Sequence, residues 1–272
     1  MAARGQKLVL QHLGLRYRRE LGDLWVDPET LGLSILNTVS IPRMHIPSSE
    51  MAKAQTFAAA ARNIAVLSGA GLSKASGIPT YRDTDGLWQN TQALKYASIE
   101  AYQADPGSFH HFWRARRREL RRAHPNAAHI ALRELQRKKS TTLITQNIDG
   151  LLQRAGCTEV IELHGSMARS RCGQCGRSRW SLFDRCLNCL GHMRPEVILF
   201  GEELPKEALS NAFESAQHCD LFLLIGSTAV VAPAAELPVL ALRAGAKLIV
   251  IDTEPPSQQG IGSRRDQLTS PR

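Results

Sequence analysis

The stretch Ile64-Ala65-Val66-Leu67-Ser68-Gly69-Ala70-Gly71-Leu72-Ser73 decides the fold of this chain. Its first four residues are apolar and partly β-branched, which is typical of a strand buried in a parallel sheet. The two glycines that follow have no Cβ and allow a ligand to approach the backbone closely. A strand, a glycine turn and a helix in this order suit a phosphate group at the helix N-terminus. The motif alone is weak, because Lys74 occupies the third glycine position of G-x-G-x-x-G, so a tight turn without a ligand is the alternative.

Length and composition indicate an ordinary globular chain. Its 272 residues can bury a large core in one or two domains. No apolar run approaches the roughly 18 residues of a membrane span, so we expect no membrane partner. The formal net charge is +9, and much of it lies in an arginine run between residues 114 and 122. Such a run is usually a solvated helix face, although attraction to acidic substrates or nucleic acid is the alternative.

The pattern divides the chain into three parts. Residues 1–50 are irregular, and we interpret them as an N-terminal extension. Residues 51–254 carry the regular elements, whereas residues 255–272 are polar and predicted to be disordered. Acidic residues mixed into segment 8–36 argue against a secretory signal, so we expect a cytoplasmic protein, or a mitochondrial one if the source is eukaryotic.

Strands alternate with helices along residues 51–254. Strands are predicted at 64–67, 141–145, 160–163, 220–225 and 247–251. Helices are predicted at 51–62, 98–122 with a break at 105–107, 126–138, 151–155 and 234–244. Polar or glycine residues follow each strand. This pattern predicts an α/β fold, with a Rossmann-like parallel sheet, helices on both faces and ligand-binding groups at the carboxyl ends of the strands.

Two Cys-x2-Cys pairs, Cys172 with Cys175 and Cys186 with Cys189, form the most specific local signal. Each pair supplies two thiolates from one tight turn, and four thiolates fill the coordination shell of a structural zinc ion. Disulfides or free thiols are the alternatives, but disulfides are rare in the cytoplasm. Segment 168–192 also has little hydrophobic periodicity. We therefore predict a small insertion domain there that is held by one structural zinc ion.

Further polar groups follow the strands predicted at 141–145 and 160–163. Gln146, Asn147 and Asp149 can form hydrogen bonds with sugar hydroxyls and an amide. His164 stands between a strand and a glycine, where a neutral imidazole suits removal of a proton from a ribose hydroxyl near pH 7. A histidine of the surface or the core is the alternative. The position at a strand end favours His164 as the catalytic base.

Taken in order, these motifs resemble those of the sirtuin family over about residues 55–254. The segments that carry the resemblance are Gly69-Ala70-Gly71-x-Ser73, Gly77-Ile78-Pro79-x-Tyr81-Arg82, Thr145-Gln146-Asn147-Ile148-Asp149, His164-Gly165, the two cysteine pairs, Arg194-Pro195, Phe200-Gly201-Glu202, Gly226-Ser227-Thr228 and Pro233-Ala234-Ala235. Two departures are that Ser227-Thr228 inverts the usual Thr-Ser order and that Asp252 replaces the usual asparagine.

The resemblance implies NAD-dependent removal of acyl groups from lysine side chains, with nicotinamide and O-acyl-ADP-ribose as products. It implies that His164 is the general base, that acylated-lysine proteins are the substrates, and that no specific nucleic acid is bound. Asp149 is implied to hold the carboxamide and Gln146 the ribose. The residues implied to contact NAD are Gly69, Ala70, Gly71, Ser73, Tyr81, Arg82, Trp88, Gln146, Asn147, Ile148, Asp149, Gly226, Ser227, Thr228, Asp252, Thr253 and Glu254.

The spacing and the short cysteine insertion are most similar to the bacterial and mitochondrial branch that removes succinyl and malonyl groups. That branch has Tyr-x-x-Arg on a helix to bind the acyl carboxylate. Here Trp113 replaces the tyrosine and Arg116 matches the arginine, so dicarboxylic acyl groups are implied besides acetyl. The alternative is that Arg116 is one more surface arginine. Segment 196–202, with Val197, Phe200 and Gly201, is implied to pair with the substrate peptide as a strand.

Three other functions stay open. Protein ADP-ribosylation shares the cofactor and the fold. A catalytically weak NAD-binding or NAD-sensing module is suggested by the polar end of the chain, where the family normally has an apolar segment over the adenine. A zinc-ribbon binder of nucleic acid explains the cysteines and the charge, but it explains neither Gln146–Asp149 nor His164.

Overall fold

The computed structural model describes residues 17–20, 23–26, 48–80, 95–179 and 185–252. A two-stranded antiparallel hairpin of β1 (Tyr17–Glu20) and β2 (Asp23–Val26) precedes the main body. Five of the implied cofactor contacts and the polar end of the chain lie outside the described residues: Tyr81, Arg82, Trp88, Thr253, Glu254 and 255–272. The division at residues 50 and 254 stays a prediction.

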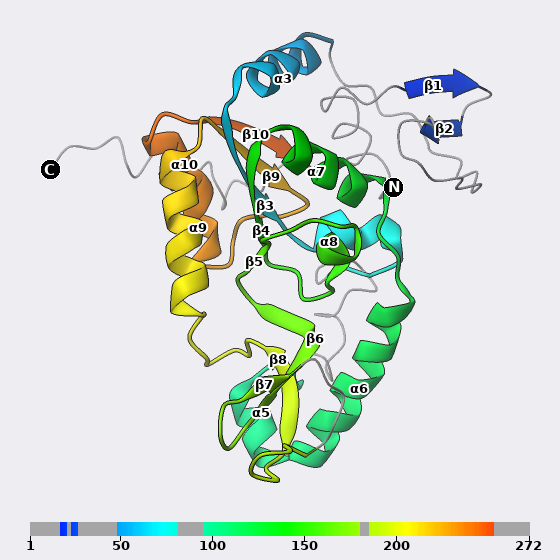
Figure 1. The fold of residues 1–272 in the computed structure, drawn as a ribbon, viewed down its shortest axis with the longest axis vertical. Coiled ribbons are helices and arrows are strands. Elements are labelled where there is room, and N and C mark those ends of the chain that lie inside the picture. The colour runs from blue at the N-terminus through cyan, green and yellow to red at the C-terminus, as the bar shows by residue number, and fades with distance from the viewer. Residues whose placement is uncertain (1–16, 21–22, 27–47, 81–94, 180–184, 253–272) are drawn as a thin grey trace, which may run out of the picture.

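A five-stranded parallel sheet forms the centre of the molecule, as predicted (Figure 1). Its strands are β3 (Asn63–Ser68), β4 (Ser140–Thr145), β5 (Ile161–Glu162), β9 (Leu221–Ile225) and β10 (Lys247–Ile251), in the order β10-β9-β3-β4-β5. The chain first adds β4 and β5 on one side of β3 and then adds β9 and β10 on the other. The reversal occurs at β3, so the loops after β3 and β9 diverge at the place where open sheets of this kind bind ligands.

Helices cover both faces of this sheet (Figure 1). One face carries α3 (Ser48–Ala60), α7 (Ala127–Lys138) and the short α8 (Leu151–Arg154), and the other carries α9 (Lys206–His218), η2 (Ala234–Glu236) and α10 (Leu237–Arg243). The strand β3 serves both layers, because Ile64 and Val66 pack with the α7 side whereas Ala65 and Leu67 pack with the α9 side. Burial of alternate residues on two faces explains why residues 64–67 are all apolar.

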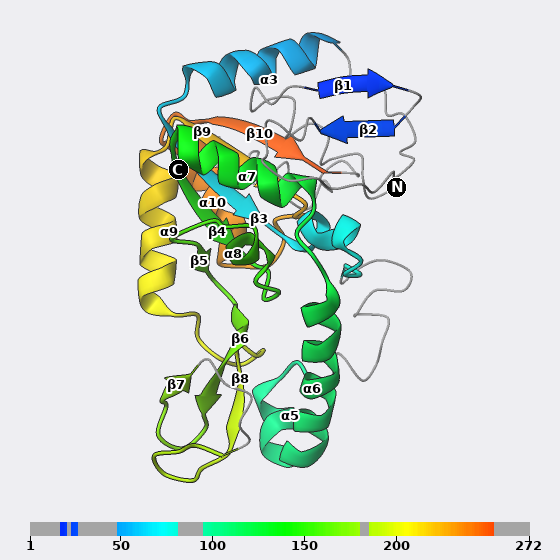
Figure 2. The same cartoon turned by 45° about the vertical axis from the view of Figure 1, so that its right-hand side comes forward.

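A second body lies beyond the edge strand β5 and contains the cysteine pairs (Figure 2). It consists of an antiparallel sheet in the order β7-β6-β8, with α5 and α6 beside it. The bounds are β6 (Gly165–Cys172), β7 (Ser178–Arg179), β8 (Met193–Val197), α5 (Ile99–Ala104) and α6 (Pro106–Arg122). Phe109 and Trp113 of α6 pack there against Met167, Val197 and Leu199.

The fold class and every predicted strand are confirmed, each strand to within one residue at either end. The helix predicted at 234–244 is present as η2 followed by α10. The hairpin of β1 and β2, which lies in the segment expected to be irregular, was not predicted, and neither were the strands β6, β7 and β8 or the helix α9. Among the described residues, no helix combines the length and the apolarity that crossing a bilayer requires.

Candidate active site

The loops after β3 and β9 meet at the carboxyl edge of the parallel sheet, and their glycines pack against one another. The N–H of Gly71 donates to the carbonyl of Gly226 at 2.9 Å. A Cβ on Gly71 would lie 2.7 Å from the Cα of Gly226, and one on Gly69 would lie 2.7 Å from the Cβ of Ser227. Gly226 has a φ of 58°, and a Cβ there would lie 2.3 Å from the amide nitrogen of Leu72. The two loops can therefore pack this closely only because these glycines have no Cβ, whether or not a ligand also approaches them.

A buried polar network connects the loop after β3 with the loop after β4. The hydroxyl of Ser73, which is fully buried, donates to Oδ2 of Asp149 at 2.7 Å. The amide of Asn147 donates to the carbonyl of Gly69 at 2.9 Å and to the Ser73 hydroxyl at 3.3 Å. Oδ1 of Asp149 accepts the N–H of Leu151 at 2.8 Å, where α8 begins. Burial raises the pKa of Asp149, although the Leu151 N–H and the Ser73 hydroxyl oppose the rise.

His164 lies where the chain leaves the parallel sheet for β6. Its Nδ1 lies 3.0 Å from the carbonyl oxygen of Gln146. A carbonyl only accepts, so this contact assigns the hydrogen to Nδ1 and leaves the lone pair on Nε2. Burial lowers the pKa of His164, which keeps the imidazole neutral near pH 7, although the bond to Gln146 opposes the shift. A neutral, oriented imidazole of this kind can accept a proton at Nε2.

The remaining described cofactor candidates lie at the same edge. The side-chain amide of Gln146 donates to the hydroxyl of Ser227 at 2.8 Å, which joins the loops after β4 and β9. Ala70 follows β3, Ile148 follows β4, Thr228 follows β9 and Asp252 directly follows β10. Hydroxyl, amide and carboxyl groups thus gather with His164, as predicted from the strand ends. This set fits the ribose hydroxyls and the carboxamide of NAD.

The four cysteines form a second site, at the tip of the antiparallel sheet. Their sulfur atoms all lie within 4.8 Å of one another, with 3.5 Å from Cys172 to Cys189 and 3.6 Å from Cys175 to Cys186. Tetrahedral zinc with sulfur ligands at about 2.3 Å needs sulfur atoms about 3.8 Å apart, so the set fits zinc. The N–H of Asn188 and other backbone N–H groups lower the pKa of the Cys186 thiol to about 6, which favours the thiolate that zinc binds. Four sulfur ligands leave no open position, so the site is structural.

The two residues implied to bind the acyl carboxylate have different environments on α6. Trp113 is buried, and its indole N–H donates to the carbonyl of Tyr96 at 2.9 Å. This N–H is therefore already satisfied by the backbone of the chain, and a role for the Trp113 ring at the acyl group stays a prediction. The side chain of Arg116 is only 10% exposed and pairs with Glu119 at 2.9 Å. Its charge also acts to lower the pKa of Asp149, and its role at the acyl group stays a prediction.

The segment implied to bind the peptide is held by this chain's own backbone. The N–H of Phe200 donates to Ala97 at 2.8 Å, and its carbonyl accepts from Ile99 at 3.0 Å. The Phe200 side chain is 56% exposed, whereas Val197 is buried against α6. Gly201 has a φ of 90° and lies against Ile99. Pairing of 196–202 with a peptide stays a prediction, and contacts from Val197 would have to come from its backbone.

Two further features of this region were not predicted. Val230 and Val231 follow the site residues Ser227 and Thr228, and both are exposed at 39% and 37%. Two successive valines just beyond a strand end are the sequence signal that could have identified them as an exposed apolar pair beside the site.

The guanidinium of Arg117 donates to the carbonyls of Met167 and Arg169, at 2.6 and 2.8 Å, and these bonds hold α6 against β6. Nothing in the arginine run distinguishes Arg117 from its neighbours.

Comparison with known proteins agrees with this arrangement. The model of the Sir2 family matches residues 69–233, which include the loops after β3, β4 and β9, His164 and the four cysteines. NAD-dependent protein deacylase 2 of Archaeoglobus fulgidus is 44% identical over 218 residues, which cover 76% of this chain and 86% of that protein. NAD-dependent protein deacetylase 1 of Geobacillus kaustophilus is 42% identical over 206 residues, with 74% and 85% covered.

Solved structures show the same fold. A Sir2 homologue in complex with NAD has a TM-score of 0.68 and 36% identity, and the match covers 74% of this chain and 82% of that one. A second structure, of a Sir2–p53 peptide–NAD⁺ complex, has a TM-score of 0.65 and 34% identity, with 74% and 85% covered. The family model matches more than half of this chain, and the two relatives are more than 40% identical to it. The chain therefore belongs to the Sir2, or sirtuin, family.

Proposed function

We propose that this chain removes acyl groups from lysine side chains of proteins, with NAD as the co-substrate and His164 as the general base. Membership of the Sir2 family and relatives that are named NAD-dependent protein deacylases support the activity. The complex of a relative with a p53 peptide supports protein segments as substrates. The observation that carries the role of His164 is its 3.0 Å contact to the Gln146 carbonyl at the edge where the polar loops meet.

The residues around His164 have distinct tasks in this mechanism. Bound NAD supplies the ADP-ribosyl group that accepts the acyl group as nicotinamide leaves. Gln146 holds the Nδ1–H of His164, so that Nε2 faces the reacting hydroxyl with its lone pair and takes up the proton. Asp149 and Asn147, each fixed by Ser73, hold the carboxamide. Ser227, held by Gln146, binds the adenosine half from the loop after β9.

The first experiment tests the reaction and the base together. Zinc-loaded protein is incubated with NAD and matched acetyl-, succinyl- and longer-acyl-lysine peptides, and the products are identified by mass spectrometry. We expect O-acyl-ADP-ribose with wild type and a loss of turnover of about 100-fold or more with His164→Ala, because general-base catalysis typically contributes that much. The matched control is His218→Ala, an exposed histidine on α9.

Zinc content and melting temperature of both variants show whether a loss is chemical or structural. Full turnover by His164→Ala would remove this residue from the mechanism. Transfer of ADP-ribose onto protein without loss of the acyl group would instead identify an ADP-ribosyltransferase. Absence of turnover on every peptide, with NAD binding retained, would identify a sensing module.

For the acyl group, we propose a preference for succinyl and malonyl lysine that is set by Arg116. The support is that only 10% of the Arg116 side chain is exposed and that its positive charge acts to lower the pKa of Asp149. A partly desolvated guanidinium binds a carboxylate through charge-assisted hydrogen bonds. Glu119 competes for the same group through Nη1, and it is 61% exposed and can be displaced into solvent.

Substitution of Arg116 tests this preference. A charge-assisted hydrogen bond contributes about 1.5–3 kcal/mol, so Arg116→Met should lower kcat/KM for a succinyl-lysine peptide about 10- to 100-fold. The acetyl-lysine peptide should lose little, because an acetyl group has no carboxylate. Arg118→Met, an exposed arginine two positions further along α6, is the control. Equal losses on both peptides would show that Arg116 has a structural role and does not select the acyl group.

A further inference from the structure

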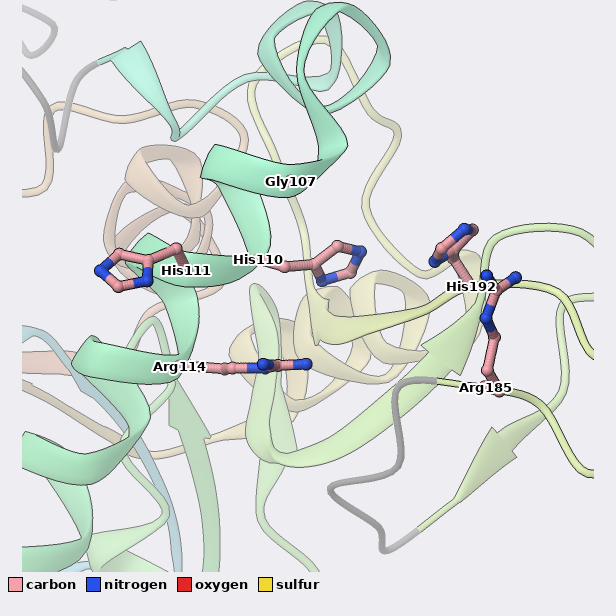
Figure 3. Close-up of a pocket in the computed structure, with 6 residues that line it drawn as sticks. All are labelled: Gly107, His110, His111, Arg114, Arg185 and His192. Atoms are coloured by element: carbon pink, nitrogen blue, oxygen red, sulfur yellow. The ribbon is translucent and has the colours of Figure 1, made fainter.

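A cavity of about 460 Å³ lies between α6 and the loops that carry the cysteines (Figure 3). A volume of this size lies within the range of small-molecule sites. None of the residues assigned above to NAD, to the acyl group or to zinc contributes to it. The lining residues are Gly107, His110, His111, Arg114, Arg185 and His192.

Each wall of the cavity presents one histidine and one arginine to the opposite wall. His110 and Arg114 are four residues apart on α6 and therefore share one face of the helix. Arg185 and His192 form an isolated antiparallel bridge, which places their side chains next to each other on the opposite wall. Figure 3 shows His110 and Arg114 extending toward His192 and Arg185, whereas His111 points away from them. The rings of His110 and His192 are stacked, with centroids 6.1 Å apart and 29° between their planes.

The described lining of this cavity is entirely basic or neutral. It contains two guanidinium groups and three imidazoles, and no carboxylate is among these six residues. The two guanidinium groups stand on opposite walls, so an anion between the walls would meet a positive charge from each side. The carboxyl of Asp105, at the start of the same helix, does not line the cavity and accepts the N–H of Ser108 as a helix cap.

The chemistry of these groups selects the kind of anion. The Arg185 guanidinium is oriented by a 3.2 Å hydrogen bond from Nη1 to the carbonyl of Leu190. Guanidinium groups bind phosphate in a forked geometry, and imidazole N–H groups are donors as well. A phosphate group offers enough oxygen atoms to accept from both walls at once, whereas a single carboxylate has only two.

The geometry points to a binding site for a small phosphate-bearing molecule in this cavity. Arg114 and Arg185 hold phosphate oxygens from opposite walls, and His110 and His192 donate from the same two sides. The inference does not depend on the proposed deacylation, because the cavity shares no residue with the acyl and NAD sites. It concerns binding alone, and the test separates this site from the cofactor site.

Calorimetry with inorganic pyrophosphate tests the site in the full, zinc-loaded protein. Saturating NAD is present throughout, so that the cofactor site cannot take up the probe. We expect wild type to bind pyrophosphate and Arg114→Ala/Arg185→Ala to bind it at least about tenfold more weakly, because charge-assisted contacts are lost. The control Arg118→Ala/Arg122→Ala removes the same charge from exposed positions of α6 and should bind like wild type.

Absence of pyrophosphate binding by wild type, or equal weakening in the two double variants, would overturn the proposal. Because Arg185 precedes the zinc ligand Cys186, zinc content is measured for each variant after the titration. A measurement on wild type alone avoids any fault in the variants: pyrophosphate should shift the side-chain nitrogen resonances of His110 and His192 but not those of His218 on α9. Uniform shifts or none would contradict a site in this cavity.

A parallel titration with a ten-nucleotide single-stranded DNA distinguishes the source of the phosphate. We expect it to bind no more tightly per phosphate than pyrophosphate. Tighter binding that is lost in Arg114→Ala/Arg185→Ala would show that the cavity belongs to a nucleic-acid surface and would overturn the assignment to a small molecule.

Discussion

Single residues join the parts of this molecule where the loops meet. Asn126 caps α7 by accepting the N–H groups of Ala128 and His129, and its amide also donates to the carbonyl of Leu72 at 2.9 Å. The residue that begins a helix on one face of the sheet therefore also holds the turn η1 (Ala70–Ser76) beside the site. His129 completes this cap, because its Nδ1 accepts the N–H of Asn126 at 3.3 Å.

His129 makes the stability of the fold depend on pH. Its side chain is fully buried, and burial lowers its pKa to about 4 from the ordinary value of 6.5. Between these two values the unfolded chain binds a proton that the folded chain does not. The free energy of unfolding should therefore fall as the pH drops from 6.5 to about 4, by up to about 1.4 kcal/mol per pH unit from this group.

His129→Gln tests this dependence, because glutamine keeps an acceptor at the third position of the cap but does not titrate. We expect urea unfolding of the variant to show a flatter pH dependence than wild type between pH 6.5 and 4.5. His124→Gln, an exposed histidine just before the same helix, is the control and should leave the slope unchanged. An identical slope in wild type and His129→Gln would show that other groups cause the loss at acid pH.

At the scale of elements, α3 depends on a residue from a distant part of the chain. The ammonium group of Lys139 donates to the carbonyls of Ala58, Ala59 and Ala61, each at 2.8 Å. The first two carbonyls belong to the last turn of α3 and the third directly follows it, where carbonyl groups have no partner within the helix and a positive charge is favourable. Lys139 immediately follows α7, so one side chain fastens α3 to the neighbouring helix.

Lys139→Met retains most of the side-chain stem and removes the three hydrogen bonds. Each bond to a charged donor is worth about 1.5–3 kcal/mol, so we expect local opening of α3 to become at least about tenfold more frequent. Hydrogen exchange should accelerate for the amides of α3 and stay unchanged for those of α9. Lys138→Met, which alters an exposed lysine, is the control, and protection of α3 equal to wild type in Lys139→Met would refute the capping role.

At the scale of the whole molecule, the zinc site supports the catalytic edge from a distance. The cluster of Cys172, Cys186 and Met193 is too small to order a sheet alone. Yet β6 begins at Gly165, directly after His164, and the N–H of Ile198 after β8 donates to the carbonyl of His164. A Cβ on Gly165 would lie 2.1 Å from the carbonyl oxygen of Glu196, so the two paired strands lie very close together beside the predicted base.

Removal of zinc should therefore abolish turnover without unfolding the parallel sheet. After treatment with a chelator, we expect hydrogen exchange to accelerate across 165–197 while β3 and β9 stay protected, because their cores lie in separate clusters. Addition of zinc should restore both protection and deacylation. Full activity of protein shown to contain no zinc would contradict this coupling.

The sequence by itself determined the five parallel strands, the paired cysteines and the position of His164. These features depend on local patterns, namely apolar runs, ligand spacing and polar residues at strand ends, which a single segment displays. The helix 126–138 was equally predictable, because Asn126 marks its start and apolar residues mark its buried side.

Only the tertiary structure decided which partner each side chain meets. It showed that Gly69, Gly71 and Gly226 pack on one another, and that the indole N–H of Trp113 is held by Tyr96. The strand β6 has a mixed composition and owes its pairing to β8, more than twenty residues away in the chain. The basic cavity combines residues of α6 with others near the zinc ligands. These contacts join segments distant in sequence, so no local pattern records them, and packing alone selects among the partners that each side chain could accept.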